Sequence, residues 1–319
     1  MEKPIQPIND LATAIDFKDN YESKVREAAD HLKYMKPASF GITLGSGLGD
    51  LANEIDIHDV VDYGAIPHFP TTTVPGHEGK LIYGRLEGVP VIGLKGRTHY
   101  YEHADDFFNN GMLKATFAVQ VLAELGVRNY FVTNAAGGLN TKYRVGDIMA
   151  LDTHIHKQPN PLLGRHRTFT RVNDGERVWR FQPMHDAYDK EFTKMLIQAG
   201  SPNKIHKGTY AAVTGPTYES KGEALELKCE LILPTKDIDG KYRVADAVGM
   251  STTGEVIIAK NRGMSCVGFS CITNEIPDDG NNDTNHEEVK AILDSKEVKD
   301  KLTSTVRKFF TLYRERHMI

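Results

Sequence analysis

The sequence has few cysteines and no closely spaced pair of them. Its 319 residues contain three, Cys229, Cys266 and Cys271, and no C-x-x-C spacing. A disulfide framework needs an even set of cysteines and a zinc knuckle needs close pairs, so neither is expected. We expect the three thiols to be buried, as free cysteines commonly are.

The sequence also lacks an excess of basic residues and a long apolar run. Its formal net charge is -4, so a polyanionic partner such as nucleic acid is not expected. No stretch approaches the roughly 18 apolar residues of a membrane span, and the first residues show no basic segment followed by an apolar core. We therefore expect a cytoplasmic protein that does not bind a membrane.

Strand-like and helix-like segments alternate along most of the chain, whose 40% hydrophobic and 26% charged residues are ordinary for a globular protein. The alternation predicts an α/β fold with a central, mixed but largely parallel twisted sheet flanked by helices. Residues 1–20 are interpreted as a loose polar lead-in and residues 21–319 as a single domain. The expected strands are 40–44, 89–94, 130–133, 147–151, 209–213, 246–248 and 265–272, and the expected helices are 21–36, 111–125, 186–199, 220–230, 253–262 and 285–314.

The first expected strand runs into Gly-Ser-Gly-Leu-Gly at residues 45–49. Glycines there let the backbone turn sharply and approach a ligand, and the amides of such a turn favour an anion. The spacing differs from the G-x-G-x-x-G of dinucleotide-binding folds, and the Gly-Lys-Ser/Thr of a P-loop is lacking. A plain strand-to-helix turn is the alternative.

Polar residues follow the ends of several expected strands, where open α/β sheets bind ligands. Arg97, His99, Ser46 and Ser251 suit a phosphate, because guanidinium, imidazole and hydroxyl groups donate to phosphate oxygens. The alternatives are that Arg97 only pairs with Glu102 and that His99 is a satisfied core histidine. Convergence after different strands favours the phosphate site.

A second set of strand-end residues suits a flat polar ring. Tyr218 and Met250 offer apolar surface, Glu219 accepts hydrogen bonds, and Asn274 both donates and accepts them. None of these residues has the character of a nucleophile. A glycosidase is not favoured either, because no second acid occupies a comparable strand end.

Two histidine-containing motifs have simpler interpretations than a metal site. His154 and His156 would share one face of a strand, but no third ligand is evident from spacing, so polar residues on an exposed edge strand are the simpler account and no metal is expected. Residues 285–288, Asn-His-Glu-Glu, are typical of a helix start with Asn285 as the cap and acids in the first turn. His286 could also point into a pocket.

Together these segments resemble the trimeric-type purine nucleoside phosphorylases. The likeness extends from about Gly41 to Val289, in the family's order and approximate spacing. Each motif alone is weak and the set is very specific. The motifs are GSGLG, PGHEG, GRTHYYE, TNAAGGLN, GDIM, GPTYES, DAVGMST, ITNE and NHEEV.

The resemblance implies a phosphorylase/hydrolase-like domain with pentosyltransferase activity in purine salvage. Orthophosphate, as co-substrate, attacks C1' of a purine nucleoside and gives the free base and (deoxy)ribose 1-phosphate, without a metal or organic cofactor. By likeness, phosphate is held by Ser46, His77 (in a mobile loop), Arg97, His99, Ala135 and Ser251; ribose by Tyr101, Met250 and His286; the purine by Tyr218, Glu219 and Asn274; and Asn274, His99 and Glu219 act in catalysis.

The reaction explains these residue types without the likeness. Breaking a glycosidic bond leaves positive charge on the sugar and negative charge on the base, so it needs an anion below C1' and hydrogen bonds to the leaving ring. A 6-oxopurine such as that of inosine or guanosine has a hydrogen on N1 for Glu219 to accept, while Asn274 can donate to N7.

An acid at position 274 would instead indicate methylthioadenosine phosphorylase. A nicotinamide oxidoreductase and a non-catalytic sensor are the alternatives from other classes.

Three features depart from the family pattern or leave it open. Glu275 stands where many members carry lysine after the base-site asparagine, and residues 233–243 form a longer polar excursion. Members form homotrimers in which an aromatic from a neighbouring subunit covers the ribose. Either Trp179 or Phe181 could serve in that place.

Overall fold

The structure is a computed structural model that describes residues 11–35, 38–45, 49–74, 77–103, 110–164, 181–231 and 242–318. In chain order its elements are α1 (Leu11–Asp19), α2 (Tyr21–His31), η1 (Lys33–Met35), β1 (Phe40–Leu44), η2 (Gly49–Glu54), β2 (Asp56–Asp62), η3 (Tyr63–Ala65), β3 (Lys80–Leu86), β4 (Val89–Lys95), η4 (Tyr100–Glu102), α3 (Asn110–Ala115), α4 (Phe117–Glu124), β5 (Asn129–Gly138), β6 (Ile148–His156), α5 (Lys190–Ala199), β7 (Ile205–Ala212), α6 (Lys221–Lys228), β8 (Glu230–Leu231), β9 (Tyr242–Arg243), β10 (Ala247–Gly249), α7 (Thr253–Asn261), β11 (Ser265–Glu275), α8 (His286–Asp294) and α9 (Lys296–His317).

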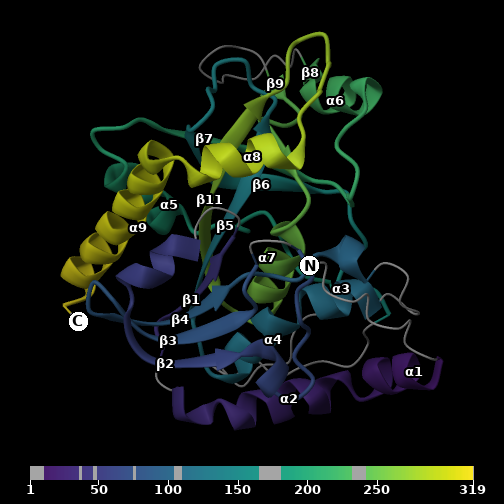
Figure 1. Cartoon of the computed structure of the whole chain (residues 1–319), viewed down its shortest axis with the longest axis vertical. Helices are drawn as coiled ribbons and strands as arrows, with labels where there is room; N and C mark the ends of the chain where they lie inside the picture. The colour runs from purple at the N-terminus through teal and green to yellow at the C-terminus, as the bar shows by residue number, and fades with distance from the viewer. Residues whose placement is uncertain are drawn as a thin grey trace.

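A mixed sheet of nine of the described strands forms the centre of the molecule (Figure 1). Its order is β10-β7-β6-β11-β5-β1-β4-β3-β2, and β10 also pairs with β5, so the strands from β10 to β5 close into a ring. Parallel pairs join β1 to β4 and β5, β7 to β6 and β10, and β5 to β11. The predicted mixed, largely parallel α/β fold is confirmed.

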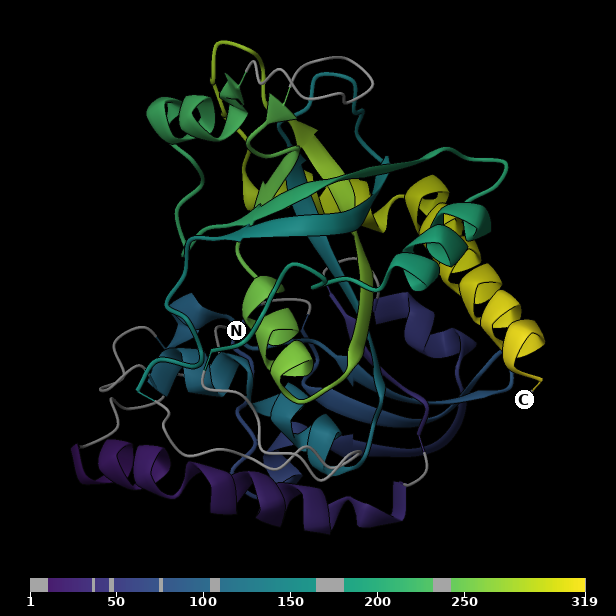
Figure 2. The same cartoon turned by 180° about the vertical axis from the view of Figure 1, so that it is seen from behind.

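Helices cover both faces of the sheet, because successive strand residues point to opposite sides. On one face Tyr130 and Val132 of β5 join a core with α2, α4 and α7. On the other face Phe131 joins Phe40 and the aromatic residues of α9 in a second core, to which α5 contributes. Figures 1 and 2 show α5 and α9 together along one side of the molecule, with α2 across its base.

All predicted strands and helices correspond to elements of the structure, but β2, β3, β8 and β9 and two helix breaks were not predicted. The helix predicted over 111–125 is α3 and α4, which are separated at Thr116. β2 and β3 pair as an antiparallel edge of the sheet, and β2 exposes much of its polar sequence, as edge strands commonly do. The helix predicted over 285–314 is two helices, because the backbone at Ser295 is extended with φ -64 and ψ 137.

The prediction of a loose lead-in is wrong for its second half. Leu11–Asp19 form α1, which buries Ala14 and carries Phe17 against the ring of Tyr21 at 5.6 Å. The side-chain amide of Asn110 also donates to the main-chain oxygen of Ala14 at 2.8 Å. These contacts dock α1 onto the domain, while residues 1–10 lie outside the described residues.

The thiols and the polar excursion complete the comparison with expectation. Cys266 and Cys271 are buried, which raises the pKa of each to about 12, but Cys229 is exposed beyond the end of α6, contrary to prediction. Most of the excursion at 233–243 lies outside the described residues; its last two residues form β9, which pairs antiparallel with the preceding β8. Within the described chain, none of the helices has the length and apolar character that crossing a membrane requires.

Candidate active site

A cavity of about 360 Å³ opens at the carboxyl ends of the central strands, a size typical of small-molecule sites. Its lining residues belong mainly to β5, β10 and β11 or follow β4, β7 and β10, and two come from α8, so segments far apart in the sequence meet there. The sequence-predicted residues that line the cavity are Arg97, His99, Tyr101, Ala135, Tyr218, Glu219, Met250, Ser251, Asn274 and His286.

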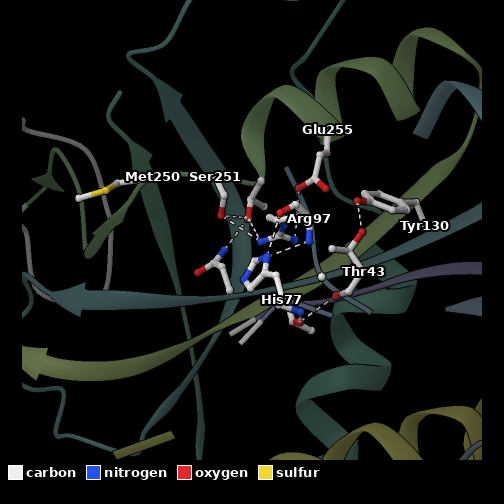
Figure 3. A network of polar contacts seen from close by, with 12 residues as sticks. Thr43, His77, Arg97, Tyr130, Met250, Ser251 and Glu255 are labelled. Atoms are coloured by element: carbon white, nitrogen blue, oxygen red, sulfur yellow. Dashed lines mark hydrogen bonds and ion pairs between the residues drawn. The ribbon is translucent and has the colours of Figure 1, made fainter. Parts of the chain in front are cut away.

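Arg97, which lines the cavity, lies at the centre of a polar network (Figure 3). Gly96 precedes it with φ +103, and a Cβ at that glycine would lie 2.9 Å from the Cβ of His77, so only glycine fits the turn after β4. The buried guanidinium donates from Nη1 to Ser251 Oγ at 3.0 Å. This contact joins the end of β4 to the segment that follows β10.

Glu255, in the first turn of α7, is the ionic partner of Arg97. Their Nη2 and Oε2 atoms are 3.2 Å apart, and both side chains are almost fully buried. The alternative that Arg97 pairs only with Glu102 is wrong, because Glu102 contacts His99 instead. Because the Glu255 carboxylate is fixed behind it, the guanidinium of Arg97 is already oriented before any ligand binds.

Thr252 connects Ser251 to the same network. Its φ of 76 is uncommon for a β-branched residue, and such strain is found at functional sites. Its hydroxyl accepts from the amide of Asn134 at 2.9 Å and from Arg97 Nη1 at 3.4 Å. The strained turn therefore holds Ser251 at the start of α7, where helix amides favour an anion.

His99 is held by Glu102 and by Tyr101. The Glu102 carboxylate accepts from the main-chain amide of His99 at 2.6 Å and contacts its Nδ1 at 3.0 Å, and it also accepts from Thr73. Burial opposes ionisation of Glu102, but these hydrogen bonds lower its pKa to about 2. The Tyr101 ring stacks on His99 at 5.0 Å. With Nδ1 turned to the carboxylate, Nε2 is the nitrogen left for the cavity.

His77, one of the predicted phosphate residues, does not line the described cavity. His77 is buried beside the main chain of Arg97, whose amide donates to its Nδ1 at 2.9 Å. Burial, followed by the charge of His99, lowers the pKa of His77 to about 4. Ser46 lies outside the described residues.

The other end of the cavity carries a carboxylate and an amide. Glu219 is 8% exposed, and burial raises its pKa. The amide of Asn274 lies close over Gly137 of β5, where a Cβ would be 3.2 Å from Asn274 Nδ2. Glu275, next to it, ties the end of β11 to Arg144 at 3.4 Å.

Met250 and His286 lie on the remaining walls. Gly215, with φ +65, lets the backbone pass Met250, since a Cβ there would be 2.5 Å from Met250 Sδ. His286 begins α8, whose predicted cap is confirmed: Asn285 Oδ1 accepts from the amide of Glu288 at 3.0 Å.

The His154–His156 strand segment is occupied by other contacts. His154 Nδ1 lies 3.2 Å from the hydroxyl of Tyr188, and His156 Nδ1 lies 2.6 Å from Thr253 Oγ1. Across the described ranges no three His, Cys, Asp or Glu side chains gather in a way that could hold a metal ion.

Sequence reasoning missed Glu255 and Thr252 as members of the site. A signal for Glu255 exists, because it lies among apolar residues in Thr-Gly-Glu-Val-Ile-Ile-Ala, and a buried acid needs a cationic partner. The strain at Thr252 has no such signal, since threonine gives no indication of a positive φ.

The two ends of the cavity differ in chemistry. Near Arg97 the groups are donors with one fixed positive charge, which suits a phosphate dianion. Near Glu219 a buried acceptor and an amide face a space bordered by Tyr218, which suits a polar aromatic ring. The cavity therefore matches a ligand pair of an anion and a ring on opposite sides of one reacting centre.

Comparisons with known proteins agree with a site for an anion and a polar aromatic ring. Residues 39–309 match the family described as the phosphorylase superfamily. The chain is 39% identical over 278 residues to purine nucleoside phosphorylase 1 of Bacillus subtilis (strain 168), which covers 86% of this chain and 93% of that protein. Among solved structures, the chain is similar to schistosoma purine nucleoside phosphorylase in complex with hypoxanthine, with a TM-score of 0.74 and 31% identity, covering 91% of this chain and 96% of that one. It is also similar to the Schistosoma mansoni enzyme in complex with adenosine, with a TM-score of 0.72, 30% identity and the same coverage.

Proposed function

The chain belongs to the phosphorylase superfamily and, within it, to the purine nucleoside phosphorylases, and from this premise we propose that it prefers 6-oxopurine (deoxy)ribonucleosides such as inosine and guanosine. The family reaction is reversible phosphorolysis, a pentosyl transfer. The preference is supported by Glu219, whose buried carboxylate lies in the cavity as an acceptor for N1–H.

Phosphate is proposed to bind at the Arg97 end. Arg97 and Ser251 donate to its oxygens, His99 contributes Nε2, and the Ala135 main chain completes the described part of the site. Ser46 would add a hydroxyl from the glycine turn. His77 acts from behind by holding the main chain of Arg97.

The nucleoside is proposed to fill the rest of the cavity. Tyr218 stacks on the purine, Glu219 accepts from N1–H and Asn274 donates to N7. Tyr101 and Met250 contact the ribose, and His286 lies near its 5'-hydroxyl. Every one of these side chains borders the same cavity.

The chemical step then needs no covalent enzyme intermediate. The C1'–N9 bond breaks with its electron pair passing to the purine, while a phosphate oxygen forms the new bond to C1'. The phosphate dianion stabilises positive charge on the sugar, and the hydrogen bond from Asn274 stabilises the negative charge that develops at N7. Such charge stabilisation, with positioning, is the contribution of the protein, and orthophosphate is a co-substrate rather than a cofactor.

Absorbance change with inosine in the presence and absence of phosphate tests the proposal. We expect cleavage that requires phosphate and releases hypoxanthine and ribose 1-phosphate, with adenosine a poor substrate. Because a structural relative holds adenosine, the comparison must use kcat/KM rather than binding. Phosphate-independent cleavage would indicate a hydrolase, and equal kcat/KM values would contradict the 6-oxopurine preference.

We also propose a cytoplasmic homotrimer in which an aromatic from a neighbouring subunit covers the ribose. Phe181, with 82% of its surface exposed, is one candidate, and Trp179 lies outside the described residues. A shared pocket lets assembly exclude water from the sugar. Sedimentation of a fully active monomer would contradict this arrangement.

A further inference from the structure

We propose that Asn282 is a positioning residue that joins Glu219 and Asn274 into one purine-reading unit. Asn282 lies in the connection between β11 and α8 and has no motif around it. Its Nδ2 donates to Glu219 Oε2 at 3.3 Å, and its Oδ1 accepts from Asn274 Nδ2 at 3.4 Å. This inference rests on the proposed function, since it concerns how that base site is organised.

The direction of these two hydrogen bonds follows from the carboxylate. An ionised carboxylate only accepts, so Asn282 must turn its amide nitrogen to Glu219 and its oxygen to Asn274. Asn274 is then obliged to present its own NH₂ group, while its Oδ1 accepts from Thr273 Oγ1 at 3.3 Å. The second hydrogen of that NH₂ group is the donor that N7 of a purine requires.

The connection is built to hold Asn282 in place. Gly280, with φ +76, packs so closely on α6 that a Cβ would lie 2.8 Å from the main-chain oxygen of Lys221. Lys228 of the same helix pairs with Asp278 at 3.1 Å, and the main-chain amide of Thr284 donates to Asn282 Oδ1 at 3.4 Å. Because α6 begins two residues after Glu219, both Glu219 and the connection between β11 and α8 are held by α6.

The contact also affects the charge of Glu219. Burial raises the pKa of this carboxyl and the nearby Glu223 raises it further, whereas the hydrogen bond from Asn282 lowers it. A donor on the carboxylate favours the ionised form. Asn282 therefore contributes to keeping Glu219 an acceptor, which is the form that reads N1–H of a 6-oxopurine.

The test compares Asn282→Ala and Asn282→Asp with the same substitutions at Asn281. Asn281 is exposed, and its main chain and side chain donate to Asp279 of the same loop. We expect Asn282→Ala to lower kcat/KM for inosine about 10-fold, the effect of one hydrogen bond to a charged group, with little change in the KM for phosphate. Asn282→Asp, although nearly isosteric, should be worse than alanine, because it sets a second carboxylate against Glu219. Both variants should shift the inosine-to-adenosine ratio toward adenosine, and the Asn281 variants should match wild type.

A purely packing role gives the opposite order, with aspartate near wild type and alanine impaired, and that order would overturn the proposal. An equal loss for inosine and adenosine, or a matching rise in the KM for phosphate, would also overturn it. Wild type is assayed first, because absence of phosphate-dependent inosine cleavage contradicts the proposed function instead. In that case calorimetry of hypoxanthine binding still tests the role of Asn282. The proposal requires Asn282→Asp to bind hypoxanthine more weakly than Asn282→Ala does.

Discussion

Arg97 and Glu255 form an ion pair, 3.2 Å between Nη2 and Oε2, whose two side chains expose only 4% and 7% of their surface. In the proposed complex the same guanidinium also meets phosphate. Glu255 thus balances the charge of Arg97 in the unliganded protein and orients it, while Nη1 already points to Ser251. The ion pair makes the proposed phosphate site rigid, but it also places the carboxylate of Glu255 near the bound anion, which repels it.

Glu255→Gln should therefore destabilise the protein and make its stability depend on phosphate. Glutamine keeps the shape of the side chain but leaves Arg97 as a buried, uncompensated charge, which costs on the order of 3 kcal/mol. Phosphate would restore the balance, so it should raise Tm more in the variant than in wild type. The control is Glu124→Gln, which breaks the ion pair between the buried Arg262 and the partly buried Glu124, whose Nη2 and Oε1 atoms are 2.7 Å apart. Neither residue lines the cavity. Phosphate should give that variant no extra gain, and equal gains for Glu255→Gln and wild type would contradict the prediction.

Arg97→Lys should weaken phosphate use. A planar guanidinium can donate to two phosphate oxygens and to Ser251 at once, whereas an ammonium is a point charge. Loss of a hydrogen bond to a charged group costs about 1.5–3 kcal/mol, or roughly 10- to 100-fold in kcat/KM for phosphate. Arg85→Lys on the exposed part of β3 is the matched control. Unchanged phosphate KM and kcat in Arg97→Lys would show that the phosphate site lies elsewhere.

Much of the fold can be predicted from sequence, because buried strands carry their own signal. The apolar run at Phe40–Leu44 gives β1 with its observed ends, since both faces of that strand are covered. β2 has no such signal: it is an edge strand whose polar residues resemble a loop. The docking of α1 is likewise invisible locally, because it depends on distant partners such as Asn110.

The residues of the candidate site also fall into those that the sequence predicts and those that it does not. Strand-end chemistry predicts Arg97, Glu219 and Asn274 as site residues, since ligands bind at the carboxyl ends of strands, and all three line one cavity. Glu255 and Asn282, which contact these residues, are not predicted because the contacts exist only in the folded protein. The register of β5 against β11, which sets Asn274 beside Gly137, is also a long-range property.

The rate with inosine should fall in acid because of Glu219. Burial raises the pKa of this carboxyl above the ordinary value of 4.5. As pH falls through that raised pKa, Glu219 gains a proton and no longer accepts from N1–H, so kcat/KM for inosine decreases; above it, the acceptor is fully present. In Glu219→Gln this acidic decrease should disappear from a kcat/KM profile that is already low throughout. An identical acidic decrease in that variant would assign the titration to another group, such as phosphate itself.

Asn274→Asp should move the base preference toward adenosine. Adenine has no hydrogen on N1, so in wild type it meets buried Glu219 with two acceptors opposed, and a site built for a hydrogen bond can reject such an analogue by as much as ~10⁴-fold. Aspartate at position 274 offers an acceptor to the 6-amino group of adenine and, when protonated, can still donate to N7. The measurement is kcat/KM for inosine and adenosine in wild type and Asn274→Asp, with Asn281→Asp as the control for added charge in the neighbouring loop. An unchanged ratio in Asn274→Asp would remove Asn274 from the base site, because a residue that contacts N7 cannot exchange an amide for an acid without altering the selection between the two purines.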